Sequence, residues 1–423
     1  MKKLYSTGRL IVAHPMISGS AVMVGGSMAA NAVNYVYHFI MGRTLGVADY
    51  GNLASLYSLL YILSIVPISS SISIVKFISS SKTLKDQSAV YSGVKNLVFR
   101  ISFFSSLFIL AMSPFIEKFL HIGNTASVAL IAPILFFSLL NLVNQSTLQG
   151  MMNFFGVVVP NFVVSVIKLA IGLLLVLAGF GVVGAMSGVA ISAIVGYLVS
   201  KFMIKRSNIK STKPKLDTKA FLLYSCPVLL QALAFTAFFS VDVILVKHFF
   251  SAQEAGLYAA LSTLGKIIYF AAQPITGVMF PIISKRHAIG EKYTKVLVAS
   301  LVYTLGICVF ALTVFLFLPK LALLLYGDQY NAAADKLVWM GLFISIYTVA
   351  SLLTNFFLSI GKTKIVILPI SFSLIQIVAI WIFHNSLLEV IQISLTLMLV
   401  LVLALFSYLL YNSTNLGYAK ASK

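Results

Sequence analysis

Residues 42–52 read GRTLGVADYGN, and residues 247–257 read KHFFSAQEAGL. In both stretches an apolar segment gives way to polar residues that end in an acid, one further residue and a glycine. The two glycines, Gly51 and Gly256, lie 205 positions apart in a chain of 423 residues. A repeat at about half the chain length predicts an internal duplication. The duplicated unit would consist of the apolar segments that flank each stretch.

The composition is that of a membrane protein. Hydrophobic residues make up 60% of the chain and charged residues 9%, which is too little charge to cover a soluble domain. A helix of about 20 apolar residues crosses the roughly 30 Å hydrocarbon core of a bilayer. We therefore expect an all-α polytopic protein with twelve transmembrane helices, at residues 17–40, 53–78, 96–116, 125–148, 156–178, 182–203, 220–246, 255–283, 296–318, 333–358, 365–383 and 388–411.

The distribution of Lys and Arg predicts which side of the membrane each connection faces, because cytoplasmic loops retain positive charge. If the N-terminus is cytoplasmic, the cytoplasmic connections and ends carry 21 basic residues and the opposite side carries four. Both termini are therefore expected in the cytoplasm, in a protein of the cell inner (cytoplasmic) membrane. The net charge of +20 then reflects topology and an affinity for anionic membrane lipids, so we expect no nucleic-acid partner.

A basic stretch at residues 204–219 divides the predicted helices six and six. It separates an N-lobe at residues 1–203 from a C-lobe at residues 220–423, and we interpret it as the linker between two lobes. Because six is an even number, both halves begin on the same side of the membrane. This predicts a parallel internal repeat about an axis along the membrane normal, with a cavity between the lobes that suits alternating access.

Two longer stretches resemble a known family. Residues 41–66, MGRTLGVADYGNLASLYSLLYILSIV, are similar to the opening of polysaccharide biosynthesis flippases in the multidrug/oligosaccharidyl-lipid/polysaccharide (MOP) exporter superfamily. Residues 241–260, VDVILVKHFFSAQEAGLYAA, followed by VMFPIISKRH at 278–287, resemble the same family's second half. The resemblance implies a MATE-like architecture. It also implies a cargo, an undecaprenyl-pyrophosphate-linked oligosaccharide moved from the cytoplasmic to the outer leaflet, with a glycan polymerase and glycosyltransferases as partners.

Ionisable residues inside the predicted helices are the candidate site. A charge at the centre of a spanning helix costs about 2.5–3.5 kcal/mol on insertion scales, so it needs a partner, a water-filled cavity or a function. Lys168 is expected on one helix face with Asn161, Ser165 and Gly172, because their spacing follows the helical period. The other candidates lie on polar faces of the first, seventh and eighth predicted helices, and they are Asn31 and Asn34, which lead toward Arg43, then Asp242 and Lys266.

The sign of these charges predicts the chemistry of the ligand. Ammonium groups in a low-dielectric cavity favour phosphate or pyrophosphate, so Lys168, Lys266, Arg43, Asn31 and Asn34 are predicted to bind the cargo. Asp242 is the predicted site for a coupling ion, Na⁺ or H⁺. The sequence has no Walker A phosphate loop, and we expect no cofactor and no enzymatic reaction.

Other interpretations remain open at the level of sequence. Asp242 could pair with Lys266 or Lys247 as a structural element, Arg43 could be an interface residue, and the Asn stripe could join helices to one another. A multidrug/cation antiporter of the same superfamily would need a carboxylate deep in the first helix, which this sequence lacks. A membrane-embedded polysaccharide polymerase or glycosyltransferase would need an acidic pair or a large outer loop, but the longest such loop is 319–332. A scaffold without transport activity would leave the buried lysines without a purpose.

Overall fold

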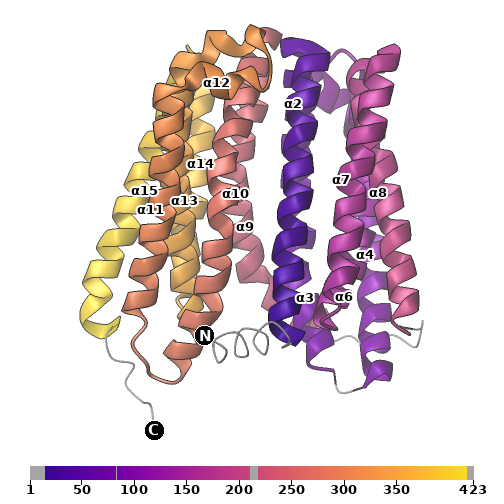
Figure 1. Ribbon diagram of the computed structural model, residues 1–423, viewed down its shortest axis with the longest axis vertical. Coiled ribbons are helices and arrows are strands. Elements are labelled where there is room, and N and C mark those ends of the chain that lie inside the picture. Colours follow the sequence, from indigo (N-terminus) through magenta and orange to yellow (C-terminus); the bar gives the residue numbers. More distant parts are fainter. Residues whose placement is uncertain (1–14, 82, 210–217, 417–423) are drawn as a thin grey trace, which may run out of the picture. The chain divides into compact units, whose positions relative to one another are not determined.

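The computed structural model describes residues 15–81, 83–209 and 218–416 (Figure 1). Residues 210–217 of the predicted linker, and the basic residues near both termini, lie outside this range. All regular elements of the described residues are helices. In chain order they are α2 (Pro15–Leu63), α3 (Ile65–Ser79), α4 (Leu84–Leu120), α5 (Thr125–Ala129), α6 (Ile131–Gly150), α7 (Phe154–Leu175), the π-helix η1 (Val176–Phe180), α8 (Gly181–Arg206), α9 (Thr218–Phe249), α10 (Ala252–Ala288), α11 (Thr294–Phe317), α12 (Pro319–Leu324), the 3₁₀ helix η2 (Asp328–Lys336), α13 (Leu337–Ser359), the 3₁₀ helix η3 (Thr363–Val366), α14 (Ile367–Ile382) and α15 (Leu387–Leu416).

Nine helices in the described part of the chain are long and apolar enough to cross a membrane. One of them, Phe154–Arg206, is 53 residues long, which is more than twice the length that a bilayer needs. It contains the turn predicted between the fifth and sixth spans, because Gly179 has a φ of 90° and Gly181 a φ of 51°. The chain is therefore a multi-pass membrane protein, and the count of twelve helices stays a prediction.

The chain divides into two compact units. Unit 1 comprises Met1–Leu45 and Leu63–Leu229, and unit 2 comprises Gly46–Ile62 and Leu230–Lys423. The last third of α2, Gly46–Ile62, thus belongs to unit 2, and α3 belongs to unit 1. The break between them follows from the sequence, because Pro67 has no N–H to donate to the carbonyl of residue 63, where α2 ends.

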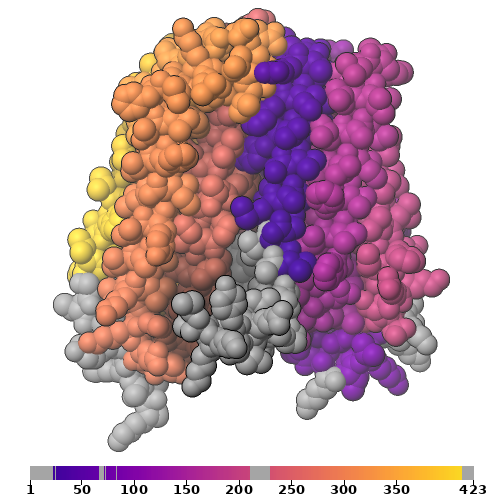
Figure 2. All heavy atoms as spheres, in the orientation of Figure 1, coloured from indigo at the N-terminus to yellow at the C-terminus, as the bar shows by residue number. Residues whose placement is uncertain are grey.

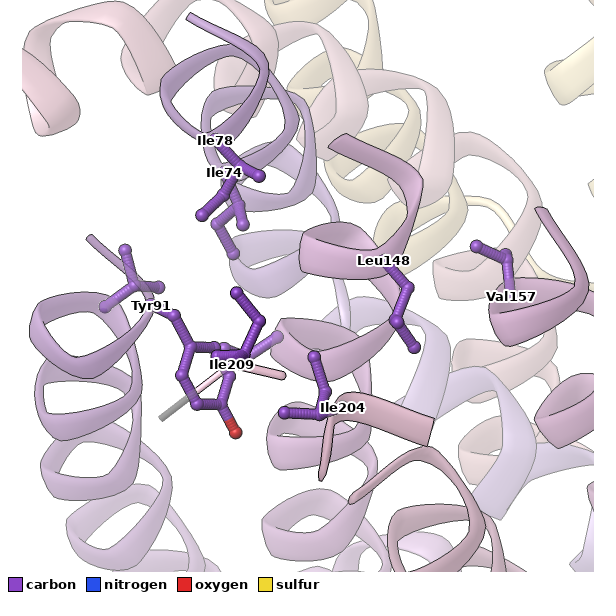
Figure 3. Packing of buried hydrophobic residues seen from close by; sticks show 9 residues of the cluster. Ile74, Ile78, Tyr91, Leu148, Val157, Ile204 and Ile209 are labelled. Atoms are coloured by element: carbon purple, nitrogen blue, oxygen red, sulfur yellow. The ribbon is translucent and has the colours of Figure 1, made fainter. Parts of the chain in front are cut away.

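Unit 1 is packed around α6, which contacts α3, α4, α7 and α8. A cluster of buried apolar side chains joins these helices near their basic ends (Figure 3). The cluster consists of Ile74, Ile78, Tyr91, Val94, Val143, Leu148, Val157, Ile204 and Ile209. The Tyr91 hydroxyl donates a 2.9 Å hydrogen bond to Asn144 Oδ1 of α6, so the phenol in this apolar cluster has a hydrogen-bond partner.

Unit 2 is packed around α13, which contacts α10, α11 and α15. In the span that ends with this helix, 78% of the most hydrophobic segment is buried, against 22% in α11. Helix α11 instead exposes its apolar side chains, as lipid-facing helices do. Figure 2 shows α11 (orange) at the surface of this unit.

The two echoed glycines contact each other inside unit 2. A Cβ at Gly51 would lie 2.7 Å from the backbone nitrogen of Gly256, and a Cβ at Gly256 would overlap the carbonyl oxygen of Val47. Only glycine allows α2 and α10 to approach this closely, as small residues do at helix crossings in membranes. The crossing is reached through Gly46, whose φ of 79° and ψ of 173° interrupt α2 in a conformation that glycine tolerates best.

A buried group of hydroxyls holds this crossing on its polar side. Tyr50 Oη lies 3.0 Å from Tyr326 Oη and 3.2 Å from Thr263 Oγ1. Tyr50 and Tyr326 are both fully buried. Burial raises the pKa of Tyr326 well above its usual value, so this phenol remains a neutral hydrogen-bonding group at physiological pH. The segment after Gly46 is therefore fixed to unit 2 by both packing and hydrogen bonds.

Candidate functional site

Lys168 lies on the buried face of α7 in unit 1. Ser165 and Gly172 are buried on the same face, in agreement with the predicted helical stripe, while Asn161 is half-buried. Only 7% of the Lys168 side chain is exposed. Its Nζ lies 4.5 Å from the centroid of the Tyr37 ring of α2, a distance at which a cation is attracted to the face of an aromatic ring.

Two glycines bring α7 and α8 together beside this lysine. A Cβ at Gly188 would lie 2.5 Å from the Cα of Gly172, so the two backbones are in contact. A Cβ at Gly172 would lie 3.1 Å from the Tyr37 ring. The Tyr37 hydroxyl also donates a 3.4 Å hydrogen bond to the carbonyl oxygen of Ala185 on α8. These contacts fix the ring on which the Lys168 ammonium lies.

A polar network extends from this face of α7 to α6. Gln145 Nε2 donates hydrogen bonds of 2.8 Å to Asn161 Oδ1 and 3.4 Å to Asn141 Oδ1. Asn144 Nδ2 donates a 3.0 Å bond to Ser200 Oγ of α8. Sequence reasoning identified Asn161 but not its partners on α6. The signal was present in the polar letters of NLVNQST at 141–147, which interrupt an otherwise apolar span.

Asp242 is the buried carboxylate of unit 2. It has no exposed surface. Its Oδ2 accepts a 2.8 Å hydrogen bond from the Tyr258 hydroxyl of α10, and its Oδ1 accepts a 2.8 Å bond from the Val243 backbone N–H. Tyr258 follows the echoed Gly256 by two residues, and its hydrogen bond to Asp242 joins α10 to α9.

Lys266 lies two turns beyond Tyr258 on the same face of α10. It is 8% exposed, and its Nζ lies 5.0 Å from the centroid of the Phe239 ring and 6.0 Å from that of Tyr61. Lys266 and Asp242 attract each other electrostatically, but they form no ion pair. Within the part of the chain that the structure describes, ion pairs closer than 4.0 Å join Arg286 to Glu291 and Lys336 to Asp335.

Several buried oxygen atoms of unit 2 have no hydrogen-bond partner in the described residues, among them Ser240 Oγ, Ser262 Oγ and Gln376 Oε1. Ser262 lies between Tyr258 and Lys266 on one face of α10. Gln376 Nε2 donates to the carbonyl oxygen of Phe238, one turn before Asp242, and to Ser394 Oγ of α15. Unpaired oxygens in an apolar interior are costly. They are the donor atoms that a cation or a water would use, and sequence reasoning did not identify them.

The remaining candidates lie in different environments. Asn31 and Arg43 are exposed on α2, and Asn34 is half-buried. Lys247 is 2% exposed and is attracted electrostatically by Asp49, which is in the same unit. Of the predicted positions, Lys168, Asp242 and Lys266 are thus the buried ones.

The candidate site contains buried lysines, neutral oxygen atoms and the carboxylate of Asp242. No group of three or more His, Cys, Asp or Glu side chains in the described residues could hold a metal ion. In unit 1 the described acidic residues are Asp86 and Glu117, which bond Thr83 and Gly123 at the ends of α4. The described part of unit 1 therefore buries one lysine, Lys168, whereas unit 2 buries two lysines, Lys247 and Lys266, together with the carboxylate of Asp242.

Comparison with known proteins identifies the fold and the family. Three solved structures share the fold: the lipid II flippase MurJ in an inward closed conformation (TM-score 0.73, 16% identity, 92% of this chain and 87% of that one), a MATE transporter in complex with MaL6 (0.64, 15%, 96% and 98%), and a MOP superfamily transporter from Pyrococcus furiosus (0.63, 16%, 96% and 97%). No curated protein matched the sequence. Residues 16–287 match the family described as "Polysaccharide biosynthesis protein". Because the match covers more than half of the chain, this protein belongs to the polysaccharide biosynthesis protein family.

Proposed function

We propose that the protein is a flippase that moves an undecaprenyl-pyrophosphate-linked oligosaccharide from the cytoplasmic to the outer leaflet by alternating access. The observation that carries the proposal is Lys168, a cation that is 7% exposed in the middle of a membrane-spanning helix. Family membership and the fold shared with the lipid II flippase MurJ support a lipid-linked cargo. The glycan itself is not specified by any of these observations.

The cost of burying Lys168 supports a functional role. A lysine at this depth costs about 2.5–3.5 kcal/mol on insertion scales, and a cation–π contact returns about 0.5–2 kcal/mol. A dianionic pyrophosphate would offset the remainder when it is bound. Lysine is a compact point charge that suits phosphate recognition, and Lys266 is proposed as a second phosphate contact. Asn31, Asn34 and Arg43 are proposed to contact other polar parts of the headgroup.

Asp242 is proposed as the ion-coupling residue. Its two hydrogen bonds leave carboxylate lone pairs available, and unpaired oxygens are buried in the same unit. Binding of Na⁺ or H⁺ at Asp242 would change the charge that Lys266 experiences. That change would link ion release to cargo binding through one pair of neighbouring helices, α9 and α10.

The proposed setting is the cell inner membrane, with both termini in the cytoplasm. The excess of Lys and Arg on one side of the predicted spans supports this orientation. Glycosyltransferases that build the lipid-linked oligosaccharide and a polymerase that extends it are the proposed partners.

The test is a transport assay on the Lys168→Ala variant. In cells, this variant should accumulate lipid-linked oligosaccharide in the cytoplasmic leaflet, while the amount of folded protein is unchanged. Lys205→Ala is the matched control, because Lys205 is exposed at the end of α8 in the same unit. Normal transfer by Lys168→Ala would remove this lysine from the mechanism.

A cation antiporter is the second candidate, and the buried carboxylate of Asp242 favours it. The shared fold with a MATE transporter is compatible with this reading. A drug-accumulation assay separates the two functions, because an antiporter should lower the cellular content of a cationic dye, and Asp242→Asn should abolish that effect. A flippase should leave the dye content unchanged.

A further inference from the structure

A groove lies between α10 and α11, away from the buried charges of unit 2. Its volume is about 600 Å³, within the range of roughly 300–1,000 Å³ that is typical of small-molecule sites. Its walls are almost entirely apolar, with Ile275, Val278 and Ile282 on α10 and Val296 and Ala299 on α11. Apolar walls of this kind are covered more favourably by an apolar group than by water.

The groove has a polar end and an apolar end. Helices α10 and α11 are joined by a short connection at residues 289–293, so they run in opposite directions and their adjoining ends lie together. Arg286 on α10 and Lys295 on α11 line the groove next to that connection. The apolar residues follow in both helices as the distance from the connection increases. Charge is therefore confined to one end.

The length of the groove is close to the thickness of one leaflet. From Pro274 to Arg286 the lining extends over twelve residue steps of α10, or about 18 Å at 1.5 Å per residue. Half of a hydrocarbon core of about 30 Å is about 15 Å. A lipid whose phosphate lies at Arg286 and Lys295 would thus place its acyl chain along the whole apolar wall.

The charged groups around the polar end favour an anion. Arg286 Nε lies 3.9 Å from Glu291 Oε2, and its Nη1 donates a 3.1 Å hydrogen bond to the carbonyl oxygen of Lys292. Glu291 is the one acid in this part of the chain, and it is outnumbered by Lys285, Arg286, Lys292 and Lys295. Basic residues near a membrane surface attract anionic lipids.

We propose that this groove binds an anionic glycerophospholipid of the adjacent leaflet, with its phosphate between Arg286 and Lys295 and one acyl chain against the apolar wall. Under the proposed topology this is the cytoplasmic leaflet. The site is separate from the proposed cargo site, and a lipid bound here would occupy the seam between α10 and α11. Its binding can be measured without any transport assay, so failure of the flippase proposal would not affect the result.

The first test fills the groove. Ala299 is exposed and lines the groove, so Ala299→Phe should fold normally and occupy the space of the acyl chain. Val298 is 52% exposed on the same helix but does not line the groove, which makes Val298→Phe the matched control. Native mass spectrometry of purified protein titrated with phosphatidylglycerol should show at least tenfold weaker binding of the first lipid to Ala299→Phe, and unchanged binding to Val298→Phe. Equal binding to both variants would overturn the proposal.

The second test removes the charges. The double variant Arg286→Gln/Lys295→Gln should bind phosphatidylglycerol at least tenfold more weakly than the wild type, while Lys285→Gln/Lys292→Gln, which removes the same charge outside the groove, should bind it within about twofold. Phosphatidylcholine should bind the wild type more weakly than phosphatidylglycerol. The assignment would be overturned if both double variants lost the same affinity, or if the wild type bound the two lipids equally well. It would also be overturned if the groove bound farnesyl diphosphate in place of phosphatidylglycerol.

Discussion

In unit 1 the buried cation Lys168 lies on the Tyr37 ring beside the crossing of Gly172 and Gly188. In unit 2 the buried cation Lys266 lies on the Phe239 ring, Gly256 of the same helix crosses Gly51 of α2, and Tyr258 of that helix donates a hydrogen bond to the carboxylate of Asp242. Both units therefore use glycine to bring helices into backbone contact next to a charge. The two units differ in their buried charges, because the described part of unit 1 has no buried acid and unit 2 has one.

This difference suggests a division of labour between the two lysines. No buried acid lies in the described part of the unit that contains Lys168, so no such carboxylate competes there with an anion that enters the site. At Lys266, the anion of the cargo must compete with the Asp242 carboxylate for the ammonium. The attraction of Lys266 for that anion therefore changes when Asp242 binds an ion. Lys168 is thus expected to contribute most to cargo affinity, and Lys266 to its coupling with the ion.

Charge reversal at Lys168 should have the largest effect. Lys168→Glu replaces an attraction worth about 1.5–3 kcal/mol for a charged hydrogen bond with a repulsion, so headgroup transfer in proteoliposomes should fall more than about 100-fold. Lys168→Arg, which keeps the charge, should retain activity within about tenfold. Lys266→Gln should lower headgroup transfer about tenfold, a smaller loss, because Asp242 already reduces the attraction of Lys266 for an anion. A larger loss for Lys266→Gln than for Lys168→Glu would reverse the division of labour.

Alanine at the crossing glycines should cost stability in both units. Gly188→Ala and Gly256→Ala each force a methyl group into backbone atoms of the facing helix, and overpacking of this kind costs about 1–3 kcal/mol. Both variants should therefore melt at a lower temperature in detergent. Gly277→Ala is the control, because a Cβ at Gly277 on α10 would meet no atom within 4 Å. If Gly277→Ala destabilised the protein as much as Gly256→Ala, close packing would not explain the glycines.

Features with a local cause could be predicted from the sequence. The buried face of α7 follows from the spacing of Ser165, Lys168 and Gly172, because the helical period alone decides which side chains share a face. The turn at Gly179 and Gly181 follows from two residues that tolerate positive φ. The apolar spans and the family resemblance also depend only on residues close together in the chain.

Contacts between helices could not be predicted in this way. Periodicity shows which face of a helix is polar, but it carries no information about the helix that this face meets. Tyr37 against Lys168, and Tyr258 against Asp242, are pairs of this kind. The echo itself showed that Gly51 and Gly256 occupy equivalent places in two stretches, and nothing in either stretch indicated that the two glycines touch each other.

The finest test of the comparison is the effect of each lysine on stability. Lys168→Met removes a buried charge whose insertion cost of about 2.5–3.5 kcal/mol exceeds the cation–π contact of about 0.5–2 kcal/mol, so thermal stability should rise by about 1 kcal/mol. Lys266→Met removes the charge that attracts Asp242 and leaves a buried carboxylate behind, so stability should fall by about 1 kcal/mol. The double variant Asp242→Asn/Lys266→Met should recover that loss, since a buried pair replaced by neutral groups is often tolerated. Shifts of the same sign for the two lysines would mean that Asp242 does not compensate Lys266, and the charge difference between the units would have no energetic consequence.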